Sequence, residues 1–330
     1  MTERLRVGVV GVGSLGFHHA RILRDVPGAA LVGVHDIDPE RSSRVSEELG
    51  VRAFPSLEEL LGRVEAVVVA VPTSDHAAVA LAAIDRGVHL LIEKPIASSL
   101  EEADRIVRSA DARGVLVATG HVERFNGALR ACEPFLEGPR FIESHRLAPF
   151  NPRGTDVAVV LDLMIHDIDL VLSLIESPVS SVRAVGVPIL TPSVDIANAR
   201  LEFEDGAVAN ITASRVSMER TRKIRFFQPS GYVSLDLARG TGEFLRLRRD
   251  APLLLMEEGL ANLSLDRVVE RVELKGDGAE PLRSELEAFV RAVRGEGKIV
   301  VSGHDGRQAL AVALEIMQRI EHHVAGWRAA

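Results

Sequence analysis

Along the first 120 residues, short apolar runs rich in β-branched side chains alternate with longer amphipathic stretches. Near-continuous apolar runs are typical of strands in a parallel sheet that is buried on both faces. The amphipathic stretches have the length and period of helices, so the alternation indicates repeated βαβ units. This half of the chain is therefore predicted to form a doubly wound parallel α/β sheet, with strands at residues 5–10, 31–35, 64–71, 88–92 and 115–119.

Helix-end signals fall between these strands. Ser56 and Ser98 are each followed three residues later by a glutamate, which is the spacing of a capping box at the start of a helix. Gly87 and Gly114 each stand directly before a predicted strand, where a glycine commonly ends the preceding helix. The local signals therefore agree with the predicted order of helices and strands.

The pattern changes after about residue 138, where polar and apolar residues begin to alternate. Asp205 and Gly206 separate two such runs, and an Asp-Gly pair in this position is a strong signal for a β-hairpin. Alternation is typical of a mixed or antiparallel sheet with helices over one face. We expect strands at 140–147, 195–203, 207–215, 222–227, 232–237 and 268–274, and closing helices at 282–294 and 305–323. The chain would then hold two domains, 1–122 and 123–330, the second an α+β domain whose final helices can pack back toward the first.

Composition narrows the possible partners. The 330 residues include 46% hydrophobic residues, enough for two cores, and the net charge is −8. Nucleic acids and anionic membranes attract concentrated positive charge, so neither is an expected partner. No apolar run approaches the roughly 20 residues of a membrane-spanning helix. The single cysteine, Cys132, excludes an intrachain disulfide and fits a reducing compartment, so we expect a cytoplasmic protein that acts on a small molecule.

A glycine-rich motif follows the first predicted strand. Gly11, Gly13 and Gly16 have the G-x-G-x-x-G spacing of a dinucleotide-binding turn, at the required place between a strand and a helix. The helix start would present its unpaired N–H groups to a pyrophosphate. Asp36 ends the second predicted strand and can accept hydrogen bonds from the ribose of NAD. The nearby Arg41 could instead bind the additional phosphate of NADP, so NADP stays an alternative cofactor. We expect an NAD-binding Rossmann domain, rather than a glycine-rich turn that has lost its cofactor, with Gly11, Gly13, Ser14, Leu15 and Gly16 around the phosphates.

Two further features are candidates for catalysis. Lys94 follows an apolar strand, and ligands bind beyond the carboxyl ends of strands in such a sheet. Asp162 and His166 are four residues apart on an amphipathic helix and so share one face. A histidine beside a carboxylate can act as an acid or a base near neutral pH. Plain structural alternatives stand beside these: a charge that merely ends a strand, a core histidine with satisfied hydrogen bonds, a solvated helix face, or a metal site, which the lack of further ligands at suitable spacing disfavours.

Together the motifs carry a family resemblance. The glycine turn, Val71-Pro72-Thr73 with His76, Glu93-Lys94-Pro95 and the helix with Asp162 and His166 resemble the Gfo/Idh/MocA oxidoreductases over essentially the whole chain. The resemblance implies that Lys94 contacts the nicotinamide and the substrate hydroxyl, that His166 is the catalytic acid or base, and that Asp162 binds substrate beside it. It also implies a cis peptide bond before Pro95 and a cofactor-binding set that adds Val71, Pro72, Thr73, His76, Glu93 and Lys94.

Three further segments, 120–126, 143–147 and 162–172, are similar to the branch of this family that oxidises the 3-hydroxyl of UDP-N-acetylglucosamine, ahead of transamination on a route to amide-linked lipid A. A nucleotide-sugar diphosphate would need cationic groups, and the guanidinium fork of arginine matches phosphate oxygens. Each of the three arginine candidates, Arg124, Arg146 and Arg153, could equally be a solvated or interface residue. The full set of candidate substrate-binding residues is Lys94, Arg124, Asn126, Arg146, Arg153, Asp162 and His166.

The family resemblance also bears on assembly. Members of the family are often dimers or tetramers, so we expect a homodimer or a homotetramer. Val208, Ile211 and Val233 on the predicted second sheet could pack on a second copy, or the chain's own helices could cover them.

The resemblance implies a mechanism in which a hydride passes from the carbinol carbon of a sugar to the nicotinamide. His166 would take the hydroxyl proton, Lys94 would stabilise the developing alkoxide, and Asp162 would orient the sugar through a neighbouring hydroxyl. Three alternatives use the same motifs: a dehydrogenase of inositol, a free aldose or another small substrate; an NAD-dependent glycoside hydrolase; and a non-catalytic NAD-binding regulator.

Overall fold

Residues from two separate stretches of the chain make up each of its two structural units. The computed structural model describes residues 4–151, 157–248, 250–251, 256 and 264–328. The first unit comprises Met1–Phe125 with Ala279–Ala311, and the second comprises Asn126–Gly278 with Val312–Ala330. The second unit is therefore not the continuous segment 123–330 that the sequence predicted, because part of the C-terminal region returns to the first unit.

The first unit is built on a six-stranded sheet in the order β3-β2-β1-β4-β5-β6. Every neighbouring pair in this sheet is parallel, which confirms the predicted doubly wound class. The sequence missed β3, which is only two residues long. The strands are β1 (Leu5–Val10), β2 (Ala29–His35), β3 (Arg52–Ala53), β4 (Ala66–Val69), β5 (His89–Glu93) and β6 (Val117–Gly120).

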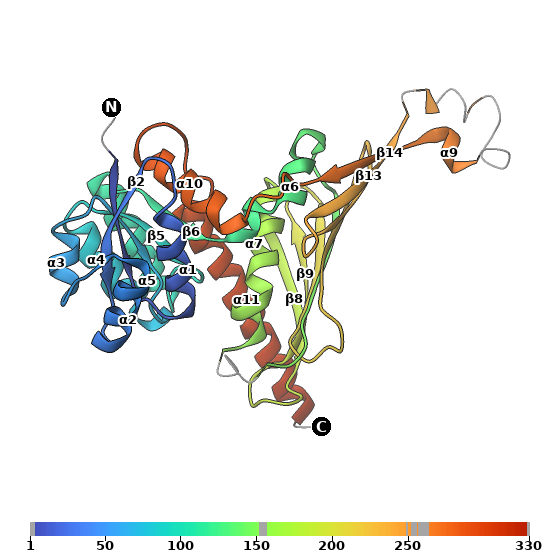
Figure 1. Ribbon diagram of the computed structural model, residues 1–330. Helices are drawn as coiled ribbons and strands as arrows, with labels where there is room; N and C mark the ends of the chain where they lie inside the picture. Colours follow the sequence, from blue (N-terminus) through green and yellow to red (C-terminus); the bar gives the residue numbers. More distant parts are fainter. Residues whose placement is uncertain (1–3, 152–156, 249, 252–255, 257–263, 329–330) are drawn as a thin grey trace. The chain divides into compact units, whose positions relative to one another are not determined.

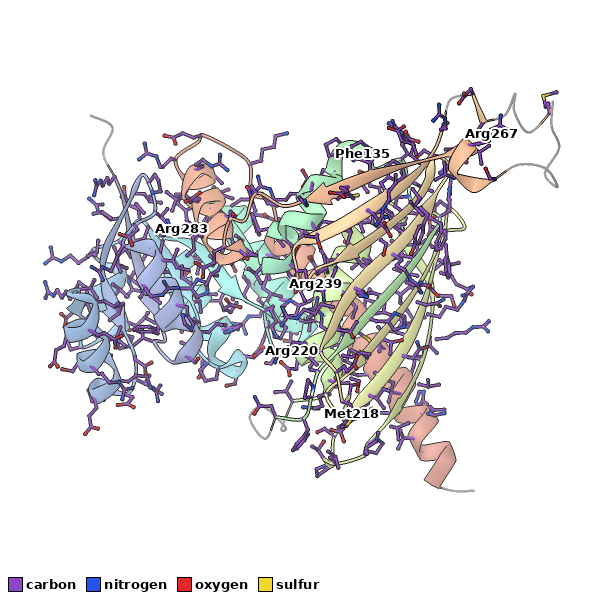
Figure 2. All side chains as sticks on the ribbon, turned by 45° about the vertical axis from the view of Figure 1, so that its right-hand side comes forward. Phe135, Met218, Arg220, Arg239, Arg267 and Arg283 are labelled. Atoms are coloured by element: carbon purple, nitrogen blue, oxygen red, sulfur yellow. The ribbon has the colours of Figure 1, made fainter. Side chains whose placement is uncertain are left out.

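A helix from late in the sequence completes the core of this unit. Leu286, Phe289 and Val290 of α10 are buried in one cluster with residues of β1 and α1. Arg283, labelled in Figure 2, donates a hydrogen bond from α10 to the carbonyl of Asp25 at 3.4 Å. The apolar face of α10 thus finds its partner more than 250 residues earlier in the chain. The helices are α1 (Ser14–Leu23), α2 (Pro39–Leu49), α3 (Leu57–Leu61), α4 (Thr73–Ile84), α5 (Leu100–Arg113), a 3-10 turn (Val122–Phe125) and α10 (Pro281–Val293).

The helix caps agree with the sequence at one site and differ at another. The Ser56 hydroxyl accepts the backbone N–H of Glu59 at 3.2 Å, as its spacing predicted. At α5 the capping residue is Ser99, which accepts from the N–H of Glu102, so the predicted Ser98 cap is wrong by one residue. Ser98 instead donates its hydroxyl to the Glu102 carboxylate.

The second unit is built on a mixed eight-stranded sheet in the order β14-β13-β12-β11-β7-β10-β9-β8. Only β7 and β10 are parallel neighbours, and the Asp-Gly hairpin joins β9 to β10 as predicted. Helix α7 and the second half of α11 run along one face (Figure 1). The sheet comprises β7 (Phe141–Leu147), β8 (Val179–Val187), β9 (Ile196–Phe203), β10 (Val208–Ser214), β11 (Thr221–Gln228), β12 (Gly231–Asp236), β13 (Thr241–Leu247) and β14 (Val269–Lys275). The helices are α6 (Gly127–Cys132), a 3-10 turn (Glu133–Phe135), a π-helix (Val160–Met164), α7 (Ile165–Leu174) and α9 (Leu265–Val268). The long helix α11 (Gly303–Arg328) belongs to the first unit up to Ala311 and to the second unit from Val312.

The other face of this sheet carries no helix within the described ranges. Strand side chains alternate between faces, so residues three apart cannot point the same way. Ile211 and Val233 lie on the covered face and are completely buried, whereas Val208 is half-buried on the open one. Of the two alternatives that the sequence left open, cover by the chain's own helices holds for Ile211 and Val233, and only Val208 belongs to the open face.

Helix length and polarity bear on membranes. None of the described helices is both long enough and apolar enough to cross a bilayer. The longest, α11, has 26 residues and carries charged side chains along its length.

The only cysteine gives a test of this packing. Cys132 ends α6 with its side chain fully buried, and burial raises the pKa of its thiol to about 12. Because the thiolate is the reactive form, we expect negligible reaction with a thiol-specific disulfide reagent at pH 8 in the native protein. One thiol should react as soon as guanidinium unfolds the chain, and rapid native labelling would contradict this burial.

Candidate active site

The glycine turn between β1 and α1 has the shape that a dinucleotide pyrophosphate needs. Gly11 has a φ of 81°, a conformation that residues with a Cβ rarely adopt. A side chain at Gly16 would collide with the carbonyl oxygen of Gly11, so α1 could not approach the turn. No atom lies within 4 Å of the place where a Cβ on Gly13 would stand, which leaves room for a phosphate there. Ser14 and Leu15 are exposed in the first turn of α1, whose N–H groups face the same space.

Asp36 connects this turn to the end of β2. Its carboxylate accepts the N–H of Val12 at 2.8 Å and that of Asp38 at 3.0 Å, and it is only 8% exposed. Arg41, the residue that could have bound the additional phosphate of NADP, pairs with Asp36 at 3.2 Å and with Asp38 at 3.3 Å. The guanidinium is therefore already committed to two carboxylates, and the site fits NAD, whose ribose hydroxyls an acid in this position binds.

Lys94 lies at the same edge of the sheet as the glycine turn. The strand order changes direction between β1 and β4, and ligands of such sheets bind where it does so. Because the strands are parallel, the residues after β1, β4 and β5 all stand at their common carboxyl edge. Lys94 follows β5, is half-buried, and precedes Pro95 through a cis peptide bond, as the resemblance implied.

Two buried histidines hold the residues on either side of Lys94. The His76 ring, 1% exposed, contacts the carbonyl of Pro95 through Nδ1 at 2.9 Å and that of Val71 through Nε2 at 3.0 Å. His19, completely buried on α1, contacts a Glu93 carboxylate oxygen through Nε2 at 2.6 Å. His76 thus binds protein carbonyls, while Thr73 is half-buried in the first turn of α4. Sequence reasoning missed His19, whose only signal is its place on the helix after the glycine turn.

The helix that carries Asp162 and His166 is not regular. The N–H of Ile165 reaches the carbonyl of Val160, five residues back, so Asp162 lies in a π-helix and His166 in the first turn of α7. π-helical turns are rare and are frequent at functional sites. Both side chains are half-buried, so His166 is not a fully enclosed core histidine. In the part of the chain that the structure describes, no group of three or more His, Cys, Asp or Glu residues could hold a metal.

A buried ion pair attaches this helix to the sheet. Asp167, next to His166, is 1% exposed and accepts from Nε of Arg146 at 2.6 Å and from the Ser144 hydroxyl at 2.7 Å. Arg146 is itself only 3% exposed on β7. Sequence reasoning assigned Arg146 to a substrate phosphate, but its guanidinium is enclosed against Asp167. Its position supports a role in holding α7 in place.

The other predicted substrate residues also have protein partners. Arg124 lies 3.9 Å from the Asp305 carboxylate, with its side chain 14% exposed. Asn126 caps α6 by accepting the N–H of Ala128, and its amide donates to the carbonyl of Leu237 at 2.8 Å. Arg153 lies outside the described residues. The role of these side chains in substrate binding stays a prediction.

The fold and the cofactor turn define an NAD-binding oxidoreductase, and comparison with known proteins gives its family. Residues 5–121 match the model of the oxidoreductase family with an NAD-binding Rossmann fold, and residues 136–233 match the GFO/IDH/MocA C-terminal domain. The chain belongs to the Gfo/Idh/MocA family, as the resemblance indicated.

Particular relatives are similar over almost the full length. UDP-N-acetylglucosamine 3-dehydrogenase of Acidithiobacillus ferrooxidans is 39% identical over 96% of this chain and 97% of its own. A solved structure of that enzyme superposes with a TM-score of 0.87 at 37% identity, covering 97% of this chain and 99% of that one. Myo-inositol 2-dehydrogenase of Thermotoga maritima is 26% identical over 96% of each chain.

A more distant structure shares the fold. Scyllo-inositol dehydrogenase of Lactobacillus casei, solved with NAD(H) and scyllo-inositol, has a TM-score of 0.78 at 20% identity, covering 97% of this chain and 98% of that one. The family model, which describes an NAD-binding Rossmann fold, agrees with NAD as the cofactor of the present chain.

The buried pair under α7 can be tested by removing one partner. Asp167→Ala leaves the Arg146 charge buried without its carboxylate, so we expect the free energy of unfolding in urea to fall by about 3–5 kcal/mol. Glu270→Ala removes an exposed pair with Arg246 (2.7 Å) on the same sheet and should cost far less, because water already solvates both charges. Equal losses in the two variants would show that the Asp167 pair does not anchor the helix.

Proposed function

We propose that the protein oxidises the 3-hydroxyl of UDP-N-acetylglucosamine to a ketone, with NAD as the hydride acceptor. The observation that carries this proposal is the 39% identity to a UDP-N-acetylglucosamine 3-dehydrogenase along almost the whole of both chains. The residues agree with it, since Lys94 stands at the cofactor edge and Asp162 and His166 stand together on one helical segment.

Each proposed catalytic residue has a separate task. NAD, when bound, accepts the hydride that leaves the carbinol carbon. His166 takes the hydroxyl proton, so that the oxygen keeps the electron pair of the broken O–H bond and forms the carbonyl. The Lys94 ammonium stabilises the negative charge that develops on that oxygen. Asp162 accepts a hydrogen bond from a neighbouring hydroxyl and so orients the sugar.

Lys94 belongs to the first unit, and Asp162 and His166 belong to the second. The anchoring of Asp167 by Arg146 and Ser144 limits the freedom of the helix that carries His166. We further propose that the reaction takes place in the cytoplasm, where a thiol such as Cys132 stays reduced, and that the keto product is passed to a transaminase on a route to amide-linked lipid A.

A substrate panel tests this function. We expect the absorbance of the reduced cofactor to rise with UDP-N-acetylglucosamine and NAD. It should rise less when UDP-glucose, free N-acetylglucosamine or myo-inositol replaces the substrate, and less when NADP replaces NAD. His166→Asn should lower kcat by about a hundredfold or more and leave NADH affinity unchanged, because it removes the base and no cofactor contact. His322→Asn, an exposed histidine on α11, serves as the matched control.

The panel also separates the alternatives. Faster turnover of myo-inositol, which the likeness to the Thermotoga maritima enzyme makes the second candidate, would overturn the substrate. Release of a free sugar without net NADH would indicate glycoside hydrolysis. NAD binding without turnover of any substrate would indicate a regulator, and full activity of the His166→Asn variant would remove His166 from the mechanism.

We also propose that the open face of the eight-stranded sheet binds a second copy of the chain. Cross-strand register places Val208, Phe141, Phe227, Tyr232 and Leu245 in one row over five neighbouring strands. The rings of Phe227 and Tyr232 lie 4.8 Å apart, and Phe227 is 41% exposed. A contiguous apolar row of this kind on a surface is typical of a protein interface, and a symmetric dimer would bury the same row twice.

The oligomeric state depends on this row if the proposal is correct. We expect light scattering after gel filtration to give a dimer or tetramer for the wild type, and Phe227→Arg to shift it toward the monomer because the interface would bury an unpaired charge. Leu190→Arg places the same charge on an equally apolar but distant loop residue, 60% exposed, and should leave the mass unchanged. A monomeric wild type would refute the proposal.

A further inference from the structure

The turn that carries Lys94 is fixed through the residues immediately before and after it. Glu93 is held by His19 of α1, and Pro95 is held by His76 of α4. Helix α1 begins at the glycine turn, and α4 begins directly after Val71 and Pro72. Helices α1 and α4, which both start at this edge, therefore each send one buried histidine to the Lys94 turn.

The Glu93 carboxylate is enclosed and keeps its charge. One oxygen contacts His19 at 2.6 Å, and the other accepts the backbone N–H of Lys94 at 3.2 Å. Burial alone would raise the pKa of Glu93, but the hydrogen bond and charge of His19, together with the Lys94 charge, hold that pKa below its ordinary value. A Cβ on Gly120 would lie only 3.1 Å from Glu93, so the carboxylate also has little room to move.

His76 joins two turns that follow neighbouring strands. Its ring nitrogens face the carbonyls of Val71 and Pro95, and burial lowers the pKa of the imidazole although both carbonyls and the Glu93 charge act in the opposite direction. A neutral imidazole donates from one nitrogen only, and an aliphatic side chain of similar size donates from none. Loss of His76 would therefore leave whichever of these two carbonyls accepts the imidazole N–H, that of Val71 or that of Pro95, without this donor, and would free the two turns from each other.

We infer that His19 and His76 are positioning residues, which set the place of the Lys94 ammonium by binding Glu93 and Pro95. The inference rests on the proposed function in that Lys94 needs an exact position only if it acts on substrate. It adds that α1, α4 and the Lys94 turn form one buried hydrogen-bonded assembly. The placement of the ammonium is then coupled to the helices that start where the dinucleotide binds.

The lysine content of the chain allows a test that needs no activity. There are four lysines, and Lys223, Lys275 and Lys298 are exposed and remote in sequence from the turn. We would measure the acetylation rate of each lysine by peptide mass spectrometry in the wild type, His19→Leu and His76→Leu. The rate at Lys94 should rise several-fold in both variants, because the turn is no longer held, while the other three rates stay constant.

The matched control for this test lies at the other end of the same strand. His89 begins β5, and its Nδ1 accepts the N–H of Leu116 at 2.9 Å. His89→Gln should change no labelling rate. Unchanged labelling of Lys94 in His19→Leu and His76→Leu would overturn the inference, and so would an equal rise at all four lysines, which would indicate general loosening of the fold.

A double-mutant cycle separates positioning from a merely structural role. In the wild-type background, His76→Leu should lower kcat about tenfold or more and leave NADH affinity unchanged. In a Lys94→Met background the same substitution should have little further effect on kcat, because the ammonium that His76 positions is already gone. His76→Asn, which keeps one donor, should recover part of the loss. Equal losses in both backgrounds, or a matching loss of NADH affinity, would refute the positioning role.

Two further results also decide the inference: a variant that fails to fold, and a wild type without sugar dehydrogenase activity. If thermal unfolding shows that His19→Leu does not fold, Glu93→Gln keeps the side-chain volume, removes the charge and should give the same rise in Lys94 labelling; no rise there overturns the inference. If the wild type oxidises no sugar substrate, the proposed function fails, while the labelling experiment still decides whether the two histidines hold the turn.

Discussion

Burial of the parallel sheet on both faces is the constraint on which the rest of the first unit depends. Every residue of β4 and four of the five residues of β5 are buried, and the polar groups of this sheet gather where the strands end. Because the strands are parallel, those ends share one edge. The glycine turn, Asp36 and the Lys94 turn therefore meet there without any direct sequence relation between them.

Two buried pairs of charged or polar groups connect elements that need a fixed geometry. His19 meets Glu93 under the Lys94 turn, and Arg146 meets Asp167 under the helix of His166. Such pairs add little net stability over well-packed apolar residues, because desolvation offsets most of the attraction. Their cost on breakage is large, so each one specifies a single arrangement of the two elements that it joins.

The second unit combines one covered and one open sheet face. Its covered face bears α7 and the π-helix before it, so the residues proposed to act on substrate lie on a segment whose backbone departs from regular geometry (Figure 1). Its open face bears a continuous apolar row that is suited to a second copy. The proposed chemistry and the proposed assembly therefore use opposite sides of one sheet, which the two-residue alternation of the strands makes possible.

The sequence alone predicted what is encoded in consecutive residues. Periodicity gave the parallel strands and the β9–β10 hairpin, and motif spacing gave the glycine turn, Asp36 and Lys94 at the end of its strand. Tertiary structure decided the rest. The partners His19 and Glu93 are 74 residues apart, and Arg146 and Asp167 are 21 apart, so no local pattern marks them. The same holds for the i+5 bond before α7, the return of α10 to the first unit, and the face to which Ile211 points. These features depend on which distant segments pack together and exclude water from their apolar and polar groups. That choice is made by the folded chain as a whole and not by neighbouring residues in the sequence.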